Sequence, residues 1–328
     1  MNDVEAHELV TAAAHAARTA QRSLATAPRA VKDAALEAMA HSLTEHTEAI
    51  LSANAADLER GRDSGMKPGL LDRLALDAGR LAGIADSLRE VVALPDPVGQ
   101  VVDGSVMPNG LRVRRVRVPL GVVGMIYEAR PNVTVDTAAL AVKSGNAIIL
   151  RGGSAAQDSN AAIIAALRSA LNAQGLPADL VTSVDAAGRD GARALMRTHG
   201  LVDALVPRGG AGLIRTVVEQ STVPVIETGS GNCHVYVDAS ADLEAAVDII
   251  VNAKTQRVGV CNAAETLLVH ADVAATYLPA AARALWDKDT VLHADPTAHR
   301  ILTEAVTTAG RDVLLTQATE ADWDTEYG

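Results

Sequence analysis

Residues 121–150 read GVVGMIYEARPNVTVDTAALAVKSGNAIIL, and this stretch decides the fold class. An apolar run at 121–126 is followed by apolar residues at helical spacing over 133–143 and by a second short apolar run at 147–150. Short apolar runs separated by a helix are typical of parallel strands that are buried on both faces. The stretch therefore predicts a strand, a helix and a second strand of an α/β sheet.

The same alternation continues toward the carboxyl end. Short apolar runs recur at 181–184, 204–206 and 223–226, and a second series of strands and helices begins at 234. The sequence Gly229-Ser230-Gly231 lies between the two series. The pattern predicts an α/β chain of two doubly wound parallel-sheet domains that meet near these glycines.

The amino-terminal third has a different pattern. Residues 5–94 are rich in alanine and carry apolar residues at helical spacing, which predicts a helical region. Pro108-Asn109-Gly110 then lies between two β-like runs, 98–107 and 111–118, and this is a hairpin signal. The alternation slips at Arg114-Arg115, which predicts a bulge there. We expect this arginine-rich ribbon to be an interaction arm rather than a core element.

Composition limits the class of partner. The 328 residues carry a net charge of -11, and only 2% of them are aromatic. Nucleic-acid binding calls for a basic face and stacking platforms, so it is not expected. No apolar run reaches the roughly 20 residues of a membrane helix, and the start MNDVEAHELV has no leader pattern. We expect a cytoplasmic protein without nucleic-acid or membrane partners.

Glycines cluster where the predicted strands end. RGGS at 151–154, RGGAG at 208–212 and GSGN at 229–232 each follow an apolar run, and two of them carry an arginine. The carboxyl ends of parallel strands are where open sheets bind ligands. None of the clusters matches G-x-G-x-x-G, but together they indicate a ligand that carries phosphate. The nine histidines and two cysteines show no metal spacing, so no metal is expected.

One cysteine has polar and cationic neighbours. Cys261 lies in NAKTQRVGVCNAAETLLVH, with Lys254 and Arg257 before it, and cations favour the nucleophilic thiolate. The alternative is a small buried hydrophobic residue, which we also expect for Cys233. Glu227, at the end of an apolar run, has two open roles, a general base and a loop cap.

Four long motifs carry a family resemblance. IYEARPNVTVDTAALAVKSGNAIILRGG, LVPRGGAGLIRTVVEQSTVPVIETGSGNCHVYVD, NAKTQRVGVCNAAETLLVH and the closing ATEADWDTEYG resemble the glutamate-5-semialdehyde dehydrogenases. These enzymes, also called gamma-glutamyl phosphate reductases, belong to the aldehyde dehydrogenase superfamily. The resemblance implies an aldehyde dehydrogenase-like fold and a role in proline biosynthesis.

The resemblance implies catalysis through a cysteine. Cys261 is expected to attack the acyl carbonyl of L-glutamyl 5-phosphate and release phosphate, and NADPH is expected to reduce the thioester to glutamate 5-semialdehyde. Asn132 and the backbone N–H of Cys261 match the superfamily's oxyanion donors. Glu227 matches the glutamate that activates water in hydrolytic members, but here the acyl group leaves phosphate, so its role stays open.

The resemblance also assigns the binding residues. Arg151 matches the superfamily's basic residue near the adenine ribose and is expected to pair with the 2'-phosphate of NADPH. Ser154 matches a position that is often acidic in NAD-preferring members, and its small hydroxyl leaves room for this phosphate. Gly209 and Gly210 match the loop beside the nicotinamide and pyrophosphate, and Glu326 matches a glutamate that contacts the nicotinamide ribose. The candidates for the anionic groups of the substrate are Arg130, Lys254 and Arg257.

The domain organisation and partners follow from the same resemblance. Residues 1–97 and 120–228 are expected to form an NADP(H)-binding domain with N-terminal helices, residues 98–119 an oligomerisation hairpin, and residues 229–328 the catalytic domain. The family continues past DWDTEY, so that domain is expected to be incomplete at its C-terminus. A homo-oligomer and a functional association with glutamate 5-kinase are also expected. The alternative is a truncated, inactive homologue that retains at most nucleotide binding.

Overall fold

The computed structural model describes residues 2–227, 231–258, 260–307, 314–325 and 327. The chain divides into two compact units, Met1–Thr228 and Gly229–Gly328, and each is described by itself. Gly229 and Ser230, where the sequence places the boundary, lie outside the described residues.

A four-stranded parallel sheet forms the centre of the first unit. Its strands run in the order β5-β4-β3-β6, with β3 at Val122–Tyr127, β4 at Ala147–Arg151, β5 at Val181–Ser183 and β6 at Ala204–Arg208. The predicted strand–helix–strand stretch is confirmed, because β3 and β4 are parallel neighbours joined by helix α6, Pro131–Lys143. The run at 223–226 forms a single parallel bridge, Leu205 to Val225, instead of a full strand.

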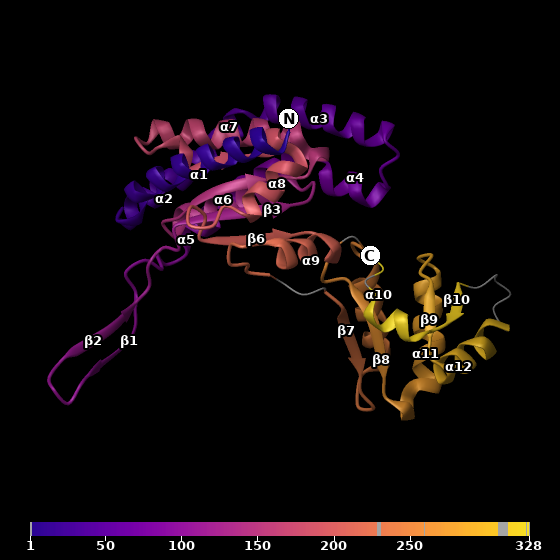
Figure 1. The fold of residues 1–328 in the computed structure, drawn as a ribbon. Helices are drawn as coiled ribbons and strands as arrows, with labels where there is room; N and C mark the ends of the chain where they lie inside the picture. Colours follow the sequence, from indigo (N-terminus) through magenta and orange to yellow (C-terminus); the bar gives the residue numbers. More distant parts are fainter. Residues whose placement is uncertain (1, 228–230, 259, 308–313, 326, 328) are drawn as a thin grey trace. The chain divides into compact units, whose positions relative to one another are not determined.

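The first unit has nine helices in the part of the chain that the structure describes, and they pack on the sheet or on one another (Figure 1). They are α1 Asp3–Ala25, α2 Arg29–Glu45, α3 Thr47–Asp63, α4 Pro68–Leu74, α5 Ala78–Ala93, α6, α7 Gln157–Ala173, α8 Gly188–Met196 and α9 Ala211–Gln220. Helices α6 and α7 connect strands that progress in one direction across the sheet, and α8 leads back to β6 on the other side of β3. Right-handed crossovers therefore place α6 and α7 on one face and α8, with its neighbour α1, on the other.

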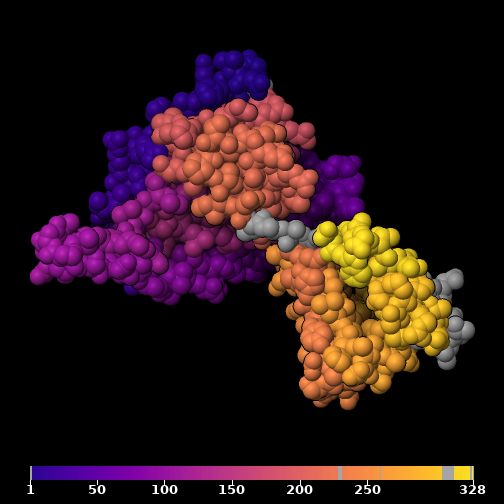
Figure 2. Space-filling view, turned by 60° about the horizontal axis from the view of Figure 1, so that its bottom comes forward, coloured from indigo at the N-terminus to yellow at the C-terminus, as the bar shows by residue number. Residues whose placement is uncertain are grey.

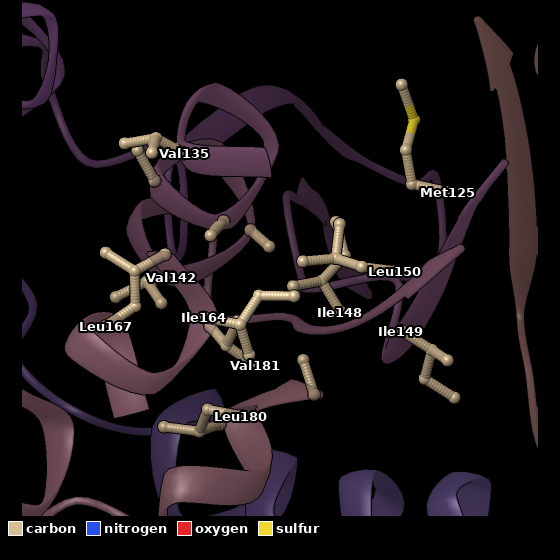
Figure 3. Close-up of a cluster of buried hydrophobic side chains, with 14 of the residues drawn as sticks. Met125, Val135, Val142, Ile148, Ile149, Leu150, Ile164, Leu167, Leu180 and Val181 are labelled. Carbon is tan, nitrogen blue, oxygen red and sulfur yellow. The ribbon is translucent and has the colours of Figure 1, made fainter. Parts of the chain in front are cut away.

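The core of the first unit is aliphatic, as the absence of phenylalanine requires. On β4, Ile148 and Leu150 point toward α6 and α7, where Val142 and Ile164 lie, and Ile149 points to the opposite face (Figure 3). All three strand residues are buried. A strand buried on both faces explains why its sequence is a continuous apolar run without polar alternation.

The predicted hairpin is present, but its bulge is in the other strand. Strands β1, Val101–Val106, and β2, Arg112–Val116, are antiparallel, and every one of their residues is exposed. Val101 pairs with Val116 and Asp103 pairs with Arg115, so the extra residue lies in β1. The prediction of a bulge at Arg114-Arg115 was wrong because β2 runs regularly and simply presents its valines on opposite faces. The hairpin projects from the first unit (Figures 1 and 2).

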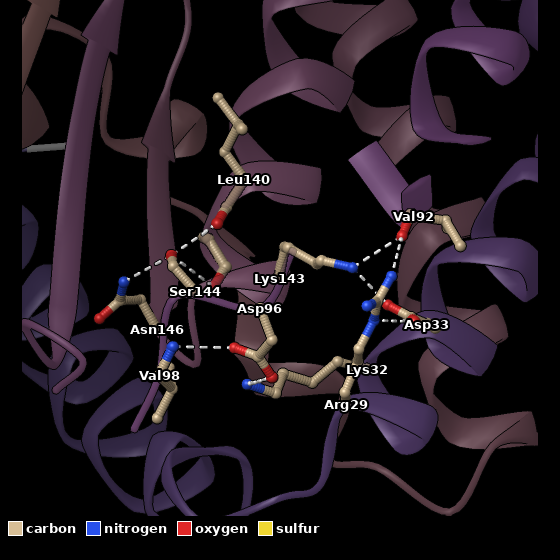
Figure 4. A network of polar contacts seen from close by, with 11 residues as sticks. Arg29, Lys32, Asp33, Val92, Asp96, Val98, Leu140, Lys143, Ser144 and Asn146 are labelled. Carbon is tan, nitrogen blue, oxygen red and sulfur yellow. Dashed lines mark hydrogen bonds and ion pairs between the residues drawn. The ribbon is translucent and has the colours of Figure 1, made fainter. Parts of the chain in front are cut away.

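Two buried lysines form ion pairs near the base of the hairpin, one with Asp96 before the hairpin and one between helices α6 and α2 (Figure 4). Lys32 of α2 forms an ion pair of 2.6 Å with Asp96, whose Oδ1 also accepts a hydrogen bond from the backbone N–H of Val98. Lys143 of α6 pairs with Asp33 at 2.5 Å. Burial acts to raise the pKa of each carboxyl, but the pKa of Asp96 is lowered by Lys32 and the Val98 backbone N–H, and the pKa of Asp33 is lowered by Lys143 and Arg29.

The second unit is also α/β, with parallel strand pairs. Strand β7, Cys233–Val237, pairs with β8, Ala264–Val269, and β9, Leu292–Ala294, pairs with β10, Leu315–Gln317. Helices α10 Leu243–Thr255, α11 Ala271–Trp286 and α12 Pro296–Thr307 connect or follow these strands. The parallel pairing agrees with the sequence prediction. In the described residues, however, the strands form two separate two-stranded sheets and not one continuous sheet.

Candidate functional site

The strand order identifies a binding edge in the first unit. The chain proceeds from β3 outward through β4 and β5, then returns to the other side of β3 with β6. Connections leave in opposite directions from β3 and β6, and the carboxyl ends at such a switch point are where open α/β sheets bind ligands. The glycine sequences predicted from the chain, 152–153 and 209–210, follow β4 and β6 at this edge.

A carboxylate joins the two sides of the switch point. Glu128, directly after β3, donates its backbone N–H to the carbonyl oxygen of Arg208 at 3.1 Å. Its side-chain Oε1 accepts a hydrogen bond of 2.6 Å from the backbone N–H of Gly210, the N-cap of α9. A Cβ on Gly209 would lie 2.7 Å from this side chain. Sequence analysis missed Glu128, and it lies in the EAR sequence directly after the first strand.

The loops after β3 and β4 approach too closely for larger residues. A Cβ on Gly153 would lie 2.8 Å from the backbone nitrogen of Ala129, and one on Gly152 would lie 2.2 Å from Nδ2 of Asn160. The backbone N–H of Gly152 donates to Oδ1 of Asp185 at 2.6 Å. Glycine is therefore required here for close packing and not for a positive φ.

Arg151, the last residue of β4, lies near two charged residues that follow β5, Asp185 and Arg189. Its Nε donates to the carbonyl oxygen of Gly188 at 3.2 Å, which brings it to the start of α8. Burial lowers the Arg151 pKa; Asp185 opposes this effect, and the charge of Arg189 adds to it. Burial raises the pKa of Asp185. Arg189 could not be predicted from the sequence, because a single arginine near a helix start is typically a surface charge.

The other expected residues of the first unit lie at helix starts or on exposed loops. Ser154 is exposed and begins the short 3-10 helix Ser154–Ala156 that leads into α7. Asn132 is exposed in the first turn of α6, directly after Arg130 and Pro131, and its Nδ2 donates to Oδ2 of Asp136 at 3.3 Å. Glu227 is exposed.

The second unit contains the predicted nucleophile. Cys261 is exposed, in the segment between α10 and β8, so the alternative of a buried hydrophobic residue is excluded. A Cβ on Gly231 would lie 2.8 Å from the carbonyl oxygen of Cys261. Arg257 is exposed in the same segment, and Glu326 lies outside the described residues.

Lys254 is already partnered within the second unit. Its Nζ donates to Oε2 of Glu265 at 2.8 Å, and both side chains are largely buried. The pair contributes to the wall of a cavity of about 410 Å³ that is also lined by apolar side chains such as Leu267 and Leu285. Cys261 is not among the residues that line this cavity, so the cavity is separate from the space around the thiol.

Neither a metal cluster nor a membrane-spanning helix is found among the described residues. Among them, no group of three or more histidine, cysteine, aspartate or glutamate side chains could hold a metal ion. None of the described helices is long and apolar enough to cross a membrane.

Comparison with known proteins agrees with these features. Residues 3–297 match the aldehyde dehydrogenase family. The gamma-glutamyl phosphate reductase of Kineococcus radiotolerans is 58% identical over 98% of this chain and 73% of its own length. That of Bifidobacterium longum subsp. infantis is 53% identical over 98% of this chain and 74% of its own length.

Solved structures give the same result. The crystal structure of gamma-glutamyl phosphate reductase from Thermotoga maritima has a TM-score of 0.86 and 44% identity, and the match covers 97% of this chain and 74% of that chain. The enzyme from Saccharomyces cerevisiae has a TM-score of 0.62 and 28% identity, over 94% of this chain and 76% of that chain. The chain thus spans about three quarters of the length of these relatives. It belongs to the gamma-glutamyl phosphate reductases of the aldehyde dehydrogenase family.

Proposed function

We propose that this chain catalyses the NADPH-dependent reduction of L-glutamyl 5-phosphate to L-glutamate 5-semialdehyde and phosphate, the second step of proline biosynthesis from glutamate. The observation that carries the proposal is the exposed thiol of Cys261, in a chain 58% identical to a reductase named for this substrate. The identity of these relatives favours this reading over the inactive homologue that retains at most nucleotide binding.

Cys261 supplies the nucleophile. Its thiolate attacks the acyl carbonyl, the bond to the phosphate oxygen breaks, phosphate leaves, and a thioester to Sγ remains. When bound, the nicotinamide cofactor supplies the hydride that reduces this thioester. The resulting thiohemiacetal of Cys261 then collapses, the C–S bond breaks, and the aldehyde leaves with the thiol restored.

Negative charge develops on the same carbonyl oxygen in both chemical steps. The side-chain amide of Asn132 and the backbone N–H of Cys261 are the proposed donors that stabilise it. Asn132 makes a long hydrogen bond of 3.3 Å to Asp136, which leaves its second amide hydrogen for the substrate. Its position in the first turn of α6 adds the positive end of the helix dipole.

The two arginines at the end of β4 and the start of α8, Arg151 and Arg189, suit a cofactor that carries a 2'-phosphate. Arg151 and Arg189 repel each other, and a phosphomonoester between them would relieve this repulsion. Ser154 offers a hydroxyl in place of a carboxylate, so it does not oppose the 2'-phosphate. The proposed contacts of the nicotinamide half are Gly209, Gly210 and, by resemblance, Glu326.

Substrate binding is proposed from the positive charges. Arg130 precedes α6, and Arg257 precedes Cys261. Lys254 would have to share its ammonium group with Glu265, because the two form an ion pair of 2.8 Å. Two alternative roles stay open for Glu227, a general base and a loop cap. Glu227→Gln distinguishes them, because only the general base requires the carboxylate.

The proposed assembly is a homo-oligomer in the cytoplasm. The hairpin, whose strands have no buried residue, is the proposed contact between subunits. A functional association with glutamate 5-kinase is proposed because the acyl phosphate hydrolyses readily in water, so direct transfer would protect it.

The reverse reaction tests the activity. The 328-residue protein is incubated with pyrroline-5-carboxylate, phosphate and NADP+, and NADPH is followed by its absorbance. We expect phosphate-dependent NADPH formation that Cys261→Ser abolishes while NADPH binding, measured by fluorescence, is retained. If the unsubstituted protein binds NADPH but forms none, the inactive-homologue reading replaces this proposal.

A further inference from the structure

The second unit brings together the only two cysteines of the sequence. Cys233 is the first residue of β7, and its pairing partner on β8 is Ala264, three residues after Cys261. The Sγ of Cys233 donates a hydrogen bond of 3.4 Å to the carbonyl oxygen of Cys261. Parallel pairing of these two strands therefore places a second thiol against the segment that carries the nucleophile.

The distance between the two residues is within reach of a disulfide. A carbonyl oxygen is about 2.4 Å from its own Cα, so Sγ of Cys233 lies within about 6 Å of the Cys261 Cα. The Sγ and Cα atoms of Cys233 are about 2.8 Å apart, so the two Cα atoms lie within about 9 Å of each other. A disulfide needs a Cα separation of about 4.4–6.8 Å and a suitable side-chain torsion. Cys261 is exposed and outside any strand or helix, so rotation of its side chain and a small loop shift meet this need without disturbing the core.

The two thiols differ in their access to solvent. Cys261 is exposed, whereas Cys233 is only partly accessible. An oxidant from solvent therefore meets Cys261 first, and Cys233 is the nearby thiol that can react with the oxidised product. We propose that Cys233 is a resolving cysteine, which forms a reversible disulfide with Cys261. The disulfide stops the proposed reductase activity and protects the Cys261 thiol from irreversible oxidation.

The chemistry balances with hydrogen peroxide as the oxidant. The Cys261 thiolate attacks one peroxide oxygen, the O–O bond breaks, hydroxide leaves, and a sulfenic acid forms on Sγ. The Cys233 thiolate then attacks this sulfur, the S–O bond breaks, a second hydroxide leaves, and the S–S bond forms. The two cysteines lose two electrons, and the peroxide is reduced to water. A dithiol such as dithiothreitol then reduces the disulfide by thiol–disulfide exchange, which restores both cysteine thiols while the dithiol is oxidised to its cyclic disulfide.

A purely structural role for Cys233 makes a different prediction. As a small half-buried residue that only donates a hydrogen bond to a carbonyl, Cys233 would leave the fate of the oxidised nucleophile unchanged. Cys233→Ser keeps a donor of similar size, and Cys233→Ala removes it, so the pair separates hydrogen bonding from redox chemistry. Neither variant changes a residue of the proposed catalytic machinery.

Mass spectrometry provides the test. The full 328-residue protein is treated with hydrogen peroxide at micromolar concentration, alkylated, and measured intact and after proteolysis. We expect a monomeric product lighter by two hydrogens, a linked peptide containing Cys233 and Cys261, and recovery of both free thiols with dithiothreitol. Both Cys233 variants should instead accumulate sulfinic and sulfonic acid on Cys261, several-fold faster than the unsubstituted protein.

The outcome is separable from the proposed function. The inhibition that we infer rests on Cys261 being the nucleophile, but the disulfide is detected without any turnover. A protein that forms the disulfide and lacks reductase activity would overturn the proposed function alone. Equal rates of sulfinic acid formation in the unsubstituted protein and both variants, with no linked peptide, would overturn the resolving role of Cys233.

Discussion

The loop after β4 packs directly on the loop after β3: a Cβ on Gly153 would lie 2.8 Å from the backbone nitrogen of Ala129. A backbone atom cannot move aside as a flexible side chain can, so Gly153→Ala must displace one of the two loops. Displacement of this kind in a packed site costs about 1–3 kcal/mol. We expect Gly153→Ala to destabilise the first unit by that amount and to weaken nucleotide binding.

Gly212 is the matched control for this substitution. It lies in the first turn of α9, and a Cβ there would have no atom within 4 Å. Gly212→Ala should therefore leave the stability unchanged or raise it by up to about 1 kcal/mol through helix propensity. Both tryptophans, Trp286 and Trp323, lie in the second unit, so tryptophan fluorescence does not report on unfolding of the first unit. Urea unfolding should therefore be followed by far-ultraviolet circular dichroism. Equal stability of the two variants would contradict the close contact.

Acid should weaken the attachment of the hairpin. The pKa of Asp96 is lowered in the folded protein, so its ion pair with Lys32 stabilises the fold above the unfolded-state pKa of about 3.9. This stabilisation is lost as the pH falls through the lower folded-state pKa, because protonation is then more favourable in the unfolded chain. The first unit should thus lose stability below about pH 4.

Removal of the carboxylate should be costly at neutral pH. The Lys32 side chain is 0% exposed, so Asp96→Asn leaves a buried ammonium without its counter-charge and should cost about 3–5 kcal/mol. Asp86→Asn is the control, since Asp86 and Arg89 are a solvent-exposed pair worth less than about 1 kcal/mol. Unfolding by urea at several pH values should show the difference between Asp96→Asn and the unsubstituted protein narrowing in acid. A difference that is constant with pH would argue against the ion pair.

Sequence reasoning identified local elements better than long-range contacts. The strand–helix–strand stretch and the Asn-Gly hairpin follow from periodicity and turn chemistry, which are local properties. The bulge was misplaced because the alternation of one strand does not reveal an extra residue in its partner. The buried Asp57 caps α7, because its Oδ2 accepts a hydrogen bond of 2.8 Å from the backbone N–H of Ser159. The two residues are far apart in the sequence, so no local pattern predicts this contact.

The candidate site divides in the same way. The position of Gly152 and Gly153 after a strand could be predicted because glycines after apolar runs are visible in the sequence. Cys261 is exposed, and its role as the nucleophile stays a prediction. Asp185 and Arg189 could not be predicted, because only the sheet order brings their loop beside Arg151. Lys254 was predicted from charge alone, and its buried partner Glu265 was unseen because the two lie on different elements.

Arg189 provides a test of cofactor selection. If Arg189 and Arg151 share the 2'-phosphate, Arg189→Gln should weaken NADPH binding by up to about fivefold, because an exposed ion pair is worth up to about 1 kcal/mol. NADH binding should not change, since NADH lacks this phosphate. Arg193→Gln is the control, because Arg193 lies one turn later on α8 and pairs with Asp190 at 3.2 Å. Fluorescence titration with both nucleotides would measure the ratio, and equal weakening of both would refute the assignment.

The hairpin should be dispensable for folding and necessary for assembly. Its two strands have only exposed residues, and an isolated two-stranded hairpin is marginal in water, so a partner surface is needed to order it. Arg117 N–H donates to the carbonyl oxygen of Gln100 at 3.0 Å, so the two ends of the hairpin are adjacent. Residues 101–116 can therefore be replaced by a short Gly-Ser linker without opening the first unit.

We expect this deletion to lower the molar mass in solution to that of a monomer while the unfolding transition of the first unit is retained. Light scattering coupled to size-exclusion chromatography measures the mass, and circular dichroism measures the transition. Arg114→Gln, which keeps the hairpin and removes one exposed charge, is the control and should retain the oligomer. An unchanged mass after deletion would assign the contact between subunits to another surface, and the exposed valines of β1 and β2 would then need a different partner.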